Sequence, residues 1–317
     1  MGKYITRRFF EMIITLFLIG TATFFLLGAI PGTAIDKKIQ KLPEATKQVV
    51  IEKYGYDKPI VERYFITLKN YIVNQEFGES IVRAGDTVSS IVKAKMPVSA
   101  RLGIQQILVG VTLGLLLGII AAMNRGKIVD YIILVGAMLF ASVPPLVLSL
   151  LLQKYMAKGA IFNLPIIGWP KGDELLFGGW KYTILPTLAG AGTYLAYYTR
   201  LMKTSMLDSI NKEYTLTARS KGLSEFAIVR KHVFRNSFIP IITVLPVAIS
   251  GVISGSFFIE RVFAIPGAGQ YFIQAIPDRD VPILMGLTLL YAAIYIIAIF
   301  ISDILYTVVD PRIRLVK

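Results

Sequence analysis

A basic stretch at residues 213–236, EYTLTARSKGLSEFAIVRKHVFRN, holds the side chains of this chain that best suit a recognisable chemical task. Between positions 200 and 235, eight cationic side chains face only three acidic ones. Two apolar residues, Leu223 and Phe226, stand among these charges. A large apolar side chain surrounded by cations suits docking to a partner protein, where the apolar group fills a pocket and the charges orient it.

The stretch also carries the signals of a helix, a turn and a second helix. Gly222 can adopt a positive φ and end the first helix, and Ser224 can cap the second. Ala218, Gly222 and Leu223 would form the core of the turn. The pattern imitates a DNA-reading motif, but both helices are tethered within a few residues of membrane-length apolar runs. They could not enter a major groove, so we expect no nucleic-acid partner.

The chain offers little for catalysis. It has no cysteine, and its one histidine, His232, lies inside the basic stretch. No phosphate-binding G-x-x-x-x-G-K-[ST] run occurs, and the nearest approach to a G-x-S-x-G serine motif, GVISG at residues 251–255, has isoleucine in the serine position. We therefore expect a non-catalytic protein with no metal site or cofactor of its own, whose energy source lies in a partner.

The composition indicates an all-α polytopic membrane protein. Of the 317 residues 55% are hydrophobic, and the mean hydropathy is +0.62. Six runs lack Asp, Glu, Lys and Arg, and each is long enough to cross about 30 Å of hydrocarbon at about 1.5 Å per residue. These predicted transmembrane helices are 12–35, 102–123, 131–153, 182–199, 236–259 and 281–302. The first exceeds the length of a signal-peptide core, so we expect it to be retained.

The charges of the short loops predict the orientation in the cell membrane. Lysine and arginine gather before the first run, at residues 125–127, at 200–235 and at the C-terminus, which places these parts and both termini in the cytoplasm. The same rule explains the net charge of +14. The predicted organisation is an N-terminal part with the first helix (1–35), an external segment (36–97), and a five-helix core (98–317) with its cytosolic loop at 200–236.

The external segment is expected to be helical. Ile60, Tyr64, Leu68 and Tyr71 recur at the spacing of one helix face. Such a stripe is too weak for a separate catalytic domain, and we expect it to fold onto the outer face of the membrane helices. Two roles remain open for it, a packed cap and a docking surface for an external partner.

Small polar residues inside the predicted spans are candidates for lining a translocation pathway: Ser142, Thr243, Ser250 and Ser254. Small residues also let helices approach closely, so helix packing is the first interpretation of any single one. The fifth span as a whole is the expected pore wall. Ionisable residues stand only near the ends of the spans, such as Glu11, Arg101 and Asp303. This argues against a proton-coupled carrier, although an ATP-independent channel or secondary carrier remains an alternative.

Several fragments resemble the permease subunit of binding-protein-dependent ABC importers, most closely the oligopeptide/dipeptide (and nickel) branch. The resemblance rests on the order of the spans, on TARSKGL followed by RKHVFRN, and on four shorter fragments. These are YDKP at 56–59, FGES at 77–80, FAIPGAG at 263–269 and DPRIR at 310–314. Of the family's general Glu-Ala-Ala…Gly signature, only Ala218 and Gly222 match literally; the peptide branch's own version fits much better.

The resemblance implies a type I importer permease fold of six helices and a role in ATP-driven import. It implies four further partners: a homologous second permease, two cytosolic ATPases that hold ATP and Mg, and an external substrate-binding protein. The residues expected to couple the chain to the ATPases are Ala218, Lys221, Gly222, Leu223, Phe226 and Arg230. Peptide is favoured over nickel as cargo, because the chain offers neither cysteine nor an external histidine.

Overall fold

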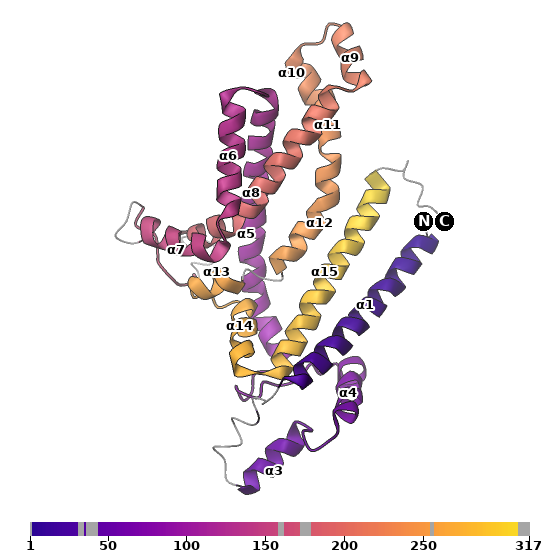
Figure 1. The fold of residues 1–317 in the computed structure, drawn as a ribbon, viewed down its shortest axis with the longest axis vertical. Coiled ribbons are helices and arrows are strands. Elements are labelled where there is room, and N and C mark those ends of the chain that lie inside the picture. Colours follow the sequence, from indigo (N-terminus) through magenta and orange to yellow (C-terminus); the bar gives the residue numbers. More distant parts are fainter. Residues whose placement is uncertain are drawn as a thin grey trace. The chain divides into compact units, whose positions relative to one another are not determined.

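The computed structural model is helical throughout most of the residues that it describes, which are 2–30, 35, 44–157, 162–171, 179–253 and 257–309 (Figure 1). Within these ranges β pairing is confined to two isolated bridges, Glu79 with Thr87 and Ala157 with Leu164. The chain forms two compact units. The first comprises Met1–Val98 and Gly267–Ile297, and the second comprises Ser99–Pro266 and Ala298–Lys317.

The first unit contains the N-terminal helix, the short helices that follow it and a helix from late in the chain. Its elements are α1 (Gly2–Ala29), α3 (Glu44–Lys53), α4 (Ile60–Lys69), the π-helical turn η1 (Asn70–Asn74) and α14 (Ala268–Asp278). The first turns of α5 (Val88–Met123) and most of α15 (Val281–Val309) also belong to it.

The predicted apolar stripe packs α4 onto α1 and α15. Tyr64 is buried against Phe24 and Met285, with Leu68 and Tyr71 beside it. The Tyr64 and Thr21 hydroxyls lie 2.8 Å apart and share a hydrogen bond. The stripe therefore folds onto membrane helices of its own chain, as its spacing predicts.

A buried aspartate fixes the segment between η1 and α5. The Asp280 carboxylate accepts hydrogen bonds from the Ser80 hydroxyl and from the Ile81 N–H, the latter at 3.2 Å. Farther out, Lys53 forms an ion pair with Glu79 at 2.8 Å, and this hydrogen bond raises the pKa of the Lys53 ammonium. These polar contacts hold an irregular segment in one conformation.

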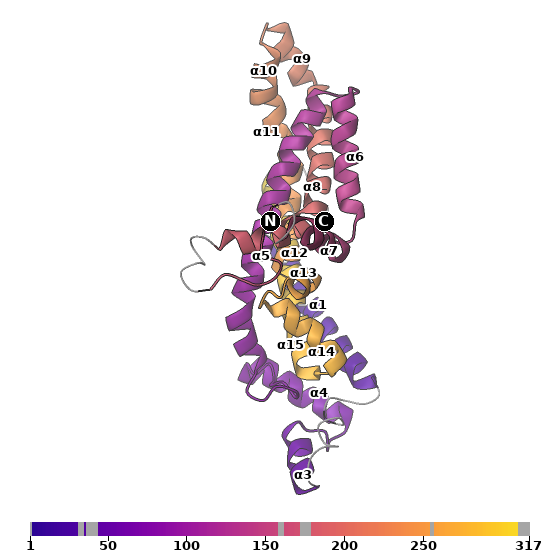
Figure 2. The ribbon, with the colours of Figure 1, turned by 90° about the vertical axis from the view of Figure 1, so that its left-hand side faces the viewer.

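The second unit contains the remaining helices. These are the rest of α5 and α15, α6 (Ile128–Ser142), α7 (Pro145–Met156), α8 (Trp180–Ile210), α9 (Glu213–Ser220), α10 (Glu225–Ile228), the π-helical turn η3 (Val229–Val233), α11 (Phe234–Ser237), α12 (Ile239–Ile253) and α13 (Phe257–Val262). Figures 1 and 2 both show α6 beside α8, and α9 with α10 beyond α11 at one end of the unit.

Three glycines let α5 lie directly against α8. They stand four apart, at Gly110, Gly114 and Gly118. A Cβ at each would come within 2.7–2.8 Å of a backbone oxygen of α8, those of Ala191, Leu195 and Thr199. Only glycine permits this approach, which is a close-packing device typical of membrane helices. The four-residue spacing of these glycines is visible in the sequence, but which helix they approach depends on the tertiary fold.

Among the described residues, three helices are long and apolar enough to cross a membrane, and the number rises to five if each bent helix pair is one span. The third predicted span is not one straight helix: α6 and α7 meet at 102°, because Val143 is extended and Pro144 and Pro145 follow it. Helix α8 covers the fourth run but is less apolar than the other spans. The chain is a polytopic helical membrane protein, and six transmembrane spans remain a prediction.

Candidate coupling surface

The turn between α9 and α10 closes as the sequence predicts. Gly222 has a φ of 76°, the left-handed conformation that glycine adopts without strain. The Leu223 N–H donates to the Ala218 carbonyl at 3.3 Å, and the Gly222 N–H donates to the Arg219 carbonyl at 2.8 Å. This pair of bonds is the Schellman arrangement, which satisfies carbonyls left open at a helix end.

The second helix begins at the predicted cap. The Ser224 hydroxyl accepts a hydrogen bond from the Ala227 N–H at 3.4 Å. The two helices are also tied across the turn, because the Arg219 guanidinium donates to both oxygens of Glu225, at 2.6 and 3.0 Å. The pair is exposed and contributes little to stability, but its two-point geometry fixes the angle at which α10 leaves the turn.

One face of this segment is locked into the second unit. Ala218, Ile228 and Val233 are buried in the core cluster that contains Met202 and Met206 of α8. Ala218 is therefore a packing residue: it supports the turn from within and offers a partner no surface.

Hydrogen bonds reinforce this packing at both ends of the segment. The Thr215 hydroxyl donates to the Ser209 carbonyl at 2.9 Å, and the Ser237 hydroxyl lies 3.1 Å from the Ser205 carbonyl. Both ends of the segment are thus bonded to α8.

The other face presents the residues predicted to contact a partner. Phe226 is 70% exposed and Leu223 39% exposed. Lys221 and Arg230 are exposed as well, and the Arg230 guanidinium carbon lies 5.8 Å from the centre of the Phe226 ring. We call Lys221, Leu223, Phe226 and Arg230 the coupling surface. Two apolar side chains with a cationic rim are the composition of an interface centre.

One of the basic residues before this segment has a different role. The Lys203 ammonium lies 2.6 Å from the Asp130 carboxylate, and both side chains are largely buried. The same carboxylate accepts the Gly126 N–H at 3.0 Å. Asp130 lies far from Lys203 in the sequence, so loop-by-loop charge counting could not find this pair. It joins the start of α6 to α8.

The predicted pathway residues show helix-internal bonding where their side chains are described. The Ser142 hydroxyl donates to the Met138 carbonyl at 2.7 Å and the Thr243 hydroxyl to the Pro240 carbonyl at 2.8 Å. Ser250 belongs to α12, and Ser254 lies outside the described residues. Because both hydroxyl protons are used within their own helices, these contacts support a role in helix structure and leave the pathway role a prediction.

Two protein families match the chain and together span most of its length. The family described as "Binding-protein-dependent transport system inner membrane component" matches residues 114–315, and the corresponding N-terminal family matches residues 1–102. A polytopic helical membrane protein with these matches is a transport-system membrane component. The chain belongs to the family of binding-protein-dependent transport system inner membrane components.

Relatives of this chain align along their whole length. The dipeptide transport system permease protein DppB of Lactococcus lactis is 37% identical, over 99% of this chain and 100% of the relative. DppB of Bacillus subtilis is also 37% identical, over 100% of this chain and 99% of the relative. The oligopeptide transport system permease protein OppB of Escherichia coli is 33% identical, over 99% of this chain and 100% of the relative.

Proposed function

We propose that this chain is the permease subunit of an ATP-driven importer of short peptides and forms half of the translocation pathway. The family assigns it to a membrane component of a binding-protein-dependent system, and its relatives are named for dipeptide and oligopeptide transport. These names favour peptide over nickel as the cargo. A homologous second permease completes the pathway, and an external binding protein delivers the peptide.

The coupling surface is the docking site for a cytosolic ATPase. The observation that carries this assignment is Phe226, a large aromatic side chain 70% exposed on a segment whose opposite face is fixed in the core. Burial in a partner's pocket removes that apolar area from water. The cationic rim then orients the partner. Two ATPases serve the complex, one on each permease, and both termini of this chain face the cytoplasm with the loop.

ATP binding draws the two ATPases together, and each moves the loop that it holds. Because Ile228 and Val233 are buried against α8, a displacement of the coupling surface reaches α8 without a flexible joint. Helix α5 follows, since its glycine stripe lies against α8. The pathway then changes from opening inward to opening outward and accepts peptide from the binding protein.

The test is transport by the purified complex in liposomes, with the binding protein supplied on its own side. We expect uptake of a labelled dipeptide that requires ATP, and no comparable uptake of labelled nickel ion. Dipeptide uptake that continues without ATP would identify a channel or secondary carrier. Nickel uptake at the dipeptide rate would overturn the cargo assignment.

A further inference from the structure

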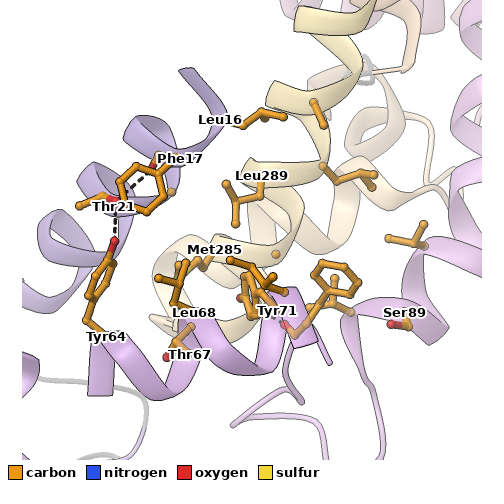
Figure 3. A pocket seen from close by; sticks show the side chains of 18 of the residues that line it. Leu16, Phe17, Thr21, Tyr64, Thr67, Leu68, Tyr71, Ser89, Met285 and Leu289 are labelled. Atoms are coloured by element: carbon orange, nitrogen blue, oxygen red, sulfur yellow. Dashed lines mark hydrogen bonds between the residues drawn. The ribbon is translucent and has the colours of Figure 1, made fainter. Parts of the chain in front are cut away.

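The first unit contains a half-open cavity of about 690 Å³ that the transport role does not explain (Figure 3). Its walls are α1, α4, η1, the start of α5 and α15. Leu16 and Phe17 face it from α1, Leu68 and Tyr71 from α4 and η1, and Met285 and Leu289 from α15. The volume falls within the range of about 300–1,000 Å³ that is usual for small-ligand sites.

Three hydroxyl groups of the wall, those of Thr21, Tyr64 and Tyr71, are bonded within the protein. Thr21 and Tyr64 bond to each other, and Thr21 also lies 2.8 Å from the Phe17 carbonyl. The Tyr71 hydroxyl donates to the Phe77 carbonyl at 3.3 Å. A peptide in this cavity would bury its own N–H and C=O groups against an apolar wall, which costs free energy for each group left without a partner. The wall therefore favours a hydrocarbon ligand.

Among the described residues that line the cavity, Lys93 is the one with a charged side chain. Ser89 and Lys93, on the first turns of α5, line one part of it, and Val88 lies against Gly286 near the start of α15. Farther along α15 the wall ends at Ala293. From Met285 to Ala293 the helix rises about 12 Å, close to one leaflet of a bilayer whose hydrocarbon is about 30 Å thick.

We propose that this cavity binds one membrane phospholipid, with an acyl chain between α1 and α15 and the phosphate at Lys93. Both bounding helices are candidate membrane spans, so lipid is the medium around them. A helix of a partner protein is the alternative occupant, and the labelling experiment below separates the two. The lysine supplies the charge that a phosphate requires. This proposal does not depend on the peptide cargo or on the ATPases.

The first test uses the unmodified protein in its complex. Nanodiscs of phosphatidylcholine carry a small fraction of phosphatidylglycerol with a photoreactive diazirine in its acyl chain. After illumination, mass spectrometry locates the adducts. We expect them on cavity residues such as Phe17 and Leu289. Adducts confined to outward-facing side chains such as Leu18 and Leu26, which are 59% and 69% exposed, would overturn the proposal.

Matched variants then test the position of the ligand. Gly20 lines the cavity, so Gly20→Phe should fill it and reduce the cavity adducts at least tenfold. Gly136→Phe adds the same bulk where a new side chain meets open space and should leave them unchanged. Equal labelling of the wild type and Gly20→Phe would contradict the site. The proposal would also be contradicted if a segment of a second permease, and not lipid, occupied the cavity.

The role of Lys93 is tested by a variant of this residue and a matched control variant. Lys93→Gln should weaken lipid retention about fivefold, since one lysine near a membrane surface contributes on the order of 1 kcal/mol. Lys69→Gln removes an exposed lysine that does not line the cavity and should change retention little. An equal loss in both variants would show that general surface charge, and not a phosphate at Lys93, holds the lipid.

Discussion

Two short helical segments outside the long spans, α4 and the loop at residues 213–237, use their apolar side chains differently. On α4, Tyr64 is buried against Phe24 of α1, and the exposed Phe65 continues an aromatic cluster that includes Phe25 of the same membrane helix. In the loop, Ile228 is buried, whereas Phe226 stands exposed with Arg230 beside it.

The difference shows what an exposed aromatic residue indicates. Phe65 lies beside an apolar membrane helix, where lipid or a neighbouring helix can cover its ring. Its exposure therefore does not indicate a soluble partner. Phe226 lies beside a guanidinium and has no apolar membrane helix next to it. A pocket of a partner protein is therefore the environment that would bury its ring. The spacing of apolar residues identifies the stripe on α4. Only the neighbours of each exposed aromatic residue distinguish its role from that of Phe226.

The largest expected effect concerns the side of the membrane on which each segment lies. The chain has no cysteine. A single cysteine introduced at Lys47 or at Lys221 is therefore its only thiol, and no other residue of the chain adds to the labelling. An impermeant maleimide applied outside intact cells should label Lys47→Cys only. Lys221→Cys should react only after the cytoplasmic side is opened. Labelling of both positions from the same side would contradict the predicted placement of the two segments on opposite sides of the membrane.

The next effect breaks the proposed protein contact. Leu223→Ala/Phe226→Ala should weaken ATPase binding about 30-fold or more, because truncation of an interface anchor commonly costs about 2 kcal/mol or more. Co-purification at graded dilution measures the loss, with Lys212→Ala as a control outside the coupling surface. A double variant that keeps its ATPases and imports at the normal rate would show that the pair is not an anchor.

The turn that orients the surface should respond in a graded way. At Gly222 a new Cβ meets no atom within 4 Å, so any penalty comes from the positive φ alone. Gly222→Val should cost at least about 1–2 kcal/mol and Gly222→Asn distinctly less, because asparagine tolerates this conformation. Coupled ATP hydrolysis should fall in the same order while membrane insertion is kept. Equal activity of the two variants would contradict the role of the turn.

The smallest effect is at the cap of α10. Ser224→Ala should destabilise the helix start by about 1 kcal/mol or less, since the cap bond from the Ala227 N–H is long, at 3.4 Å. Faster amide exchange at Ala227 measures it. Ser220→Ala is the matched control, because the Ser220 hydroxyl donates to the Leu216 carbonyl of its own helix, at 3.2 Å. Equal acceleration in both variants would remove the cap assignment.

Much of the fold and of the turn follows from local patterns. Runs without charge predict the long helices, and Gly222 and Ser224 predict a turn whose geometry depends on neighbouring backbone atoms. Ala218 shows the limit: a small residue within the motif is predicted to contact a partner, but tertiary packing buries it. The Lys203–Asp130 pair and the bend after Ser142 depend on how distant segments meet, which no local pattern encodes.

In the proposed complex the coupling surface touches an ATPase. The most direct measurement places a photocrosslinker on Lys221→Cys, beside Leu223, in the purified complex, so that both apolar anchors remain intact. We expect a covalent adduct with the ATPase subunit from this position and none from the same crosslinker on Lys47→Cys. A complex that retains its ATPase but yields no ATPase adduct from position 221 would contradict this contact.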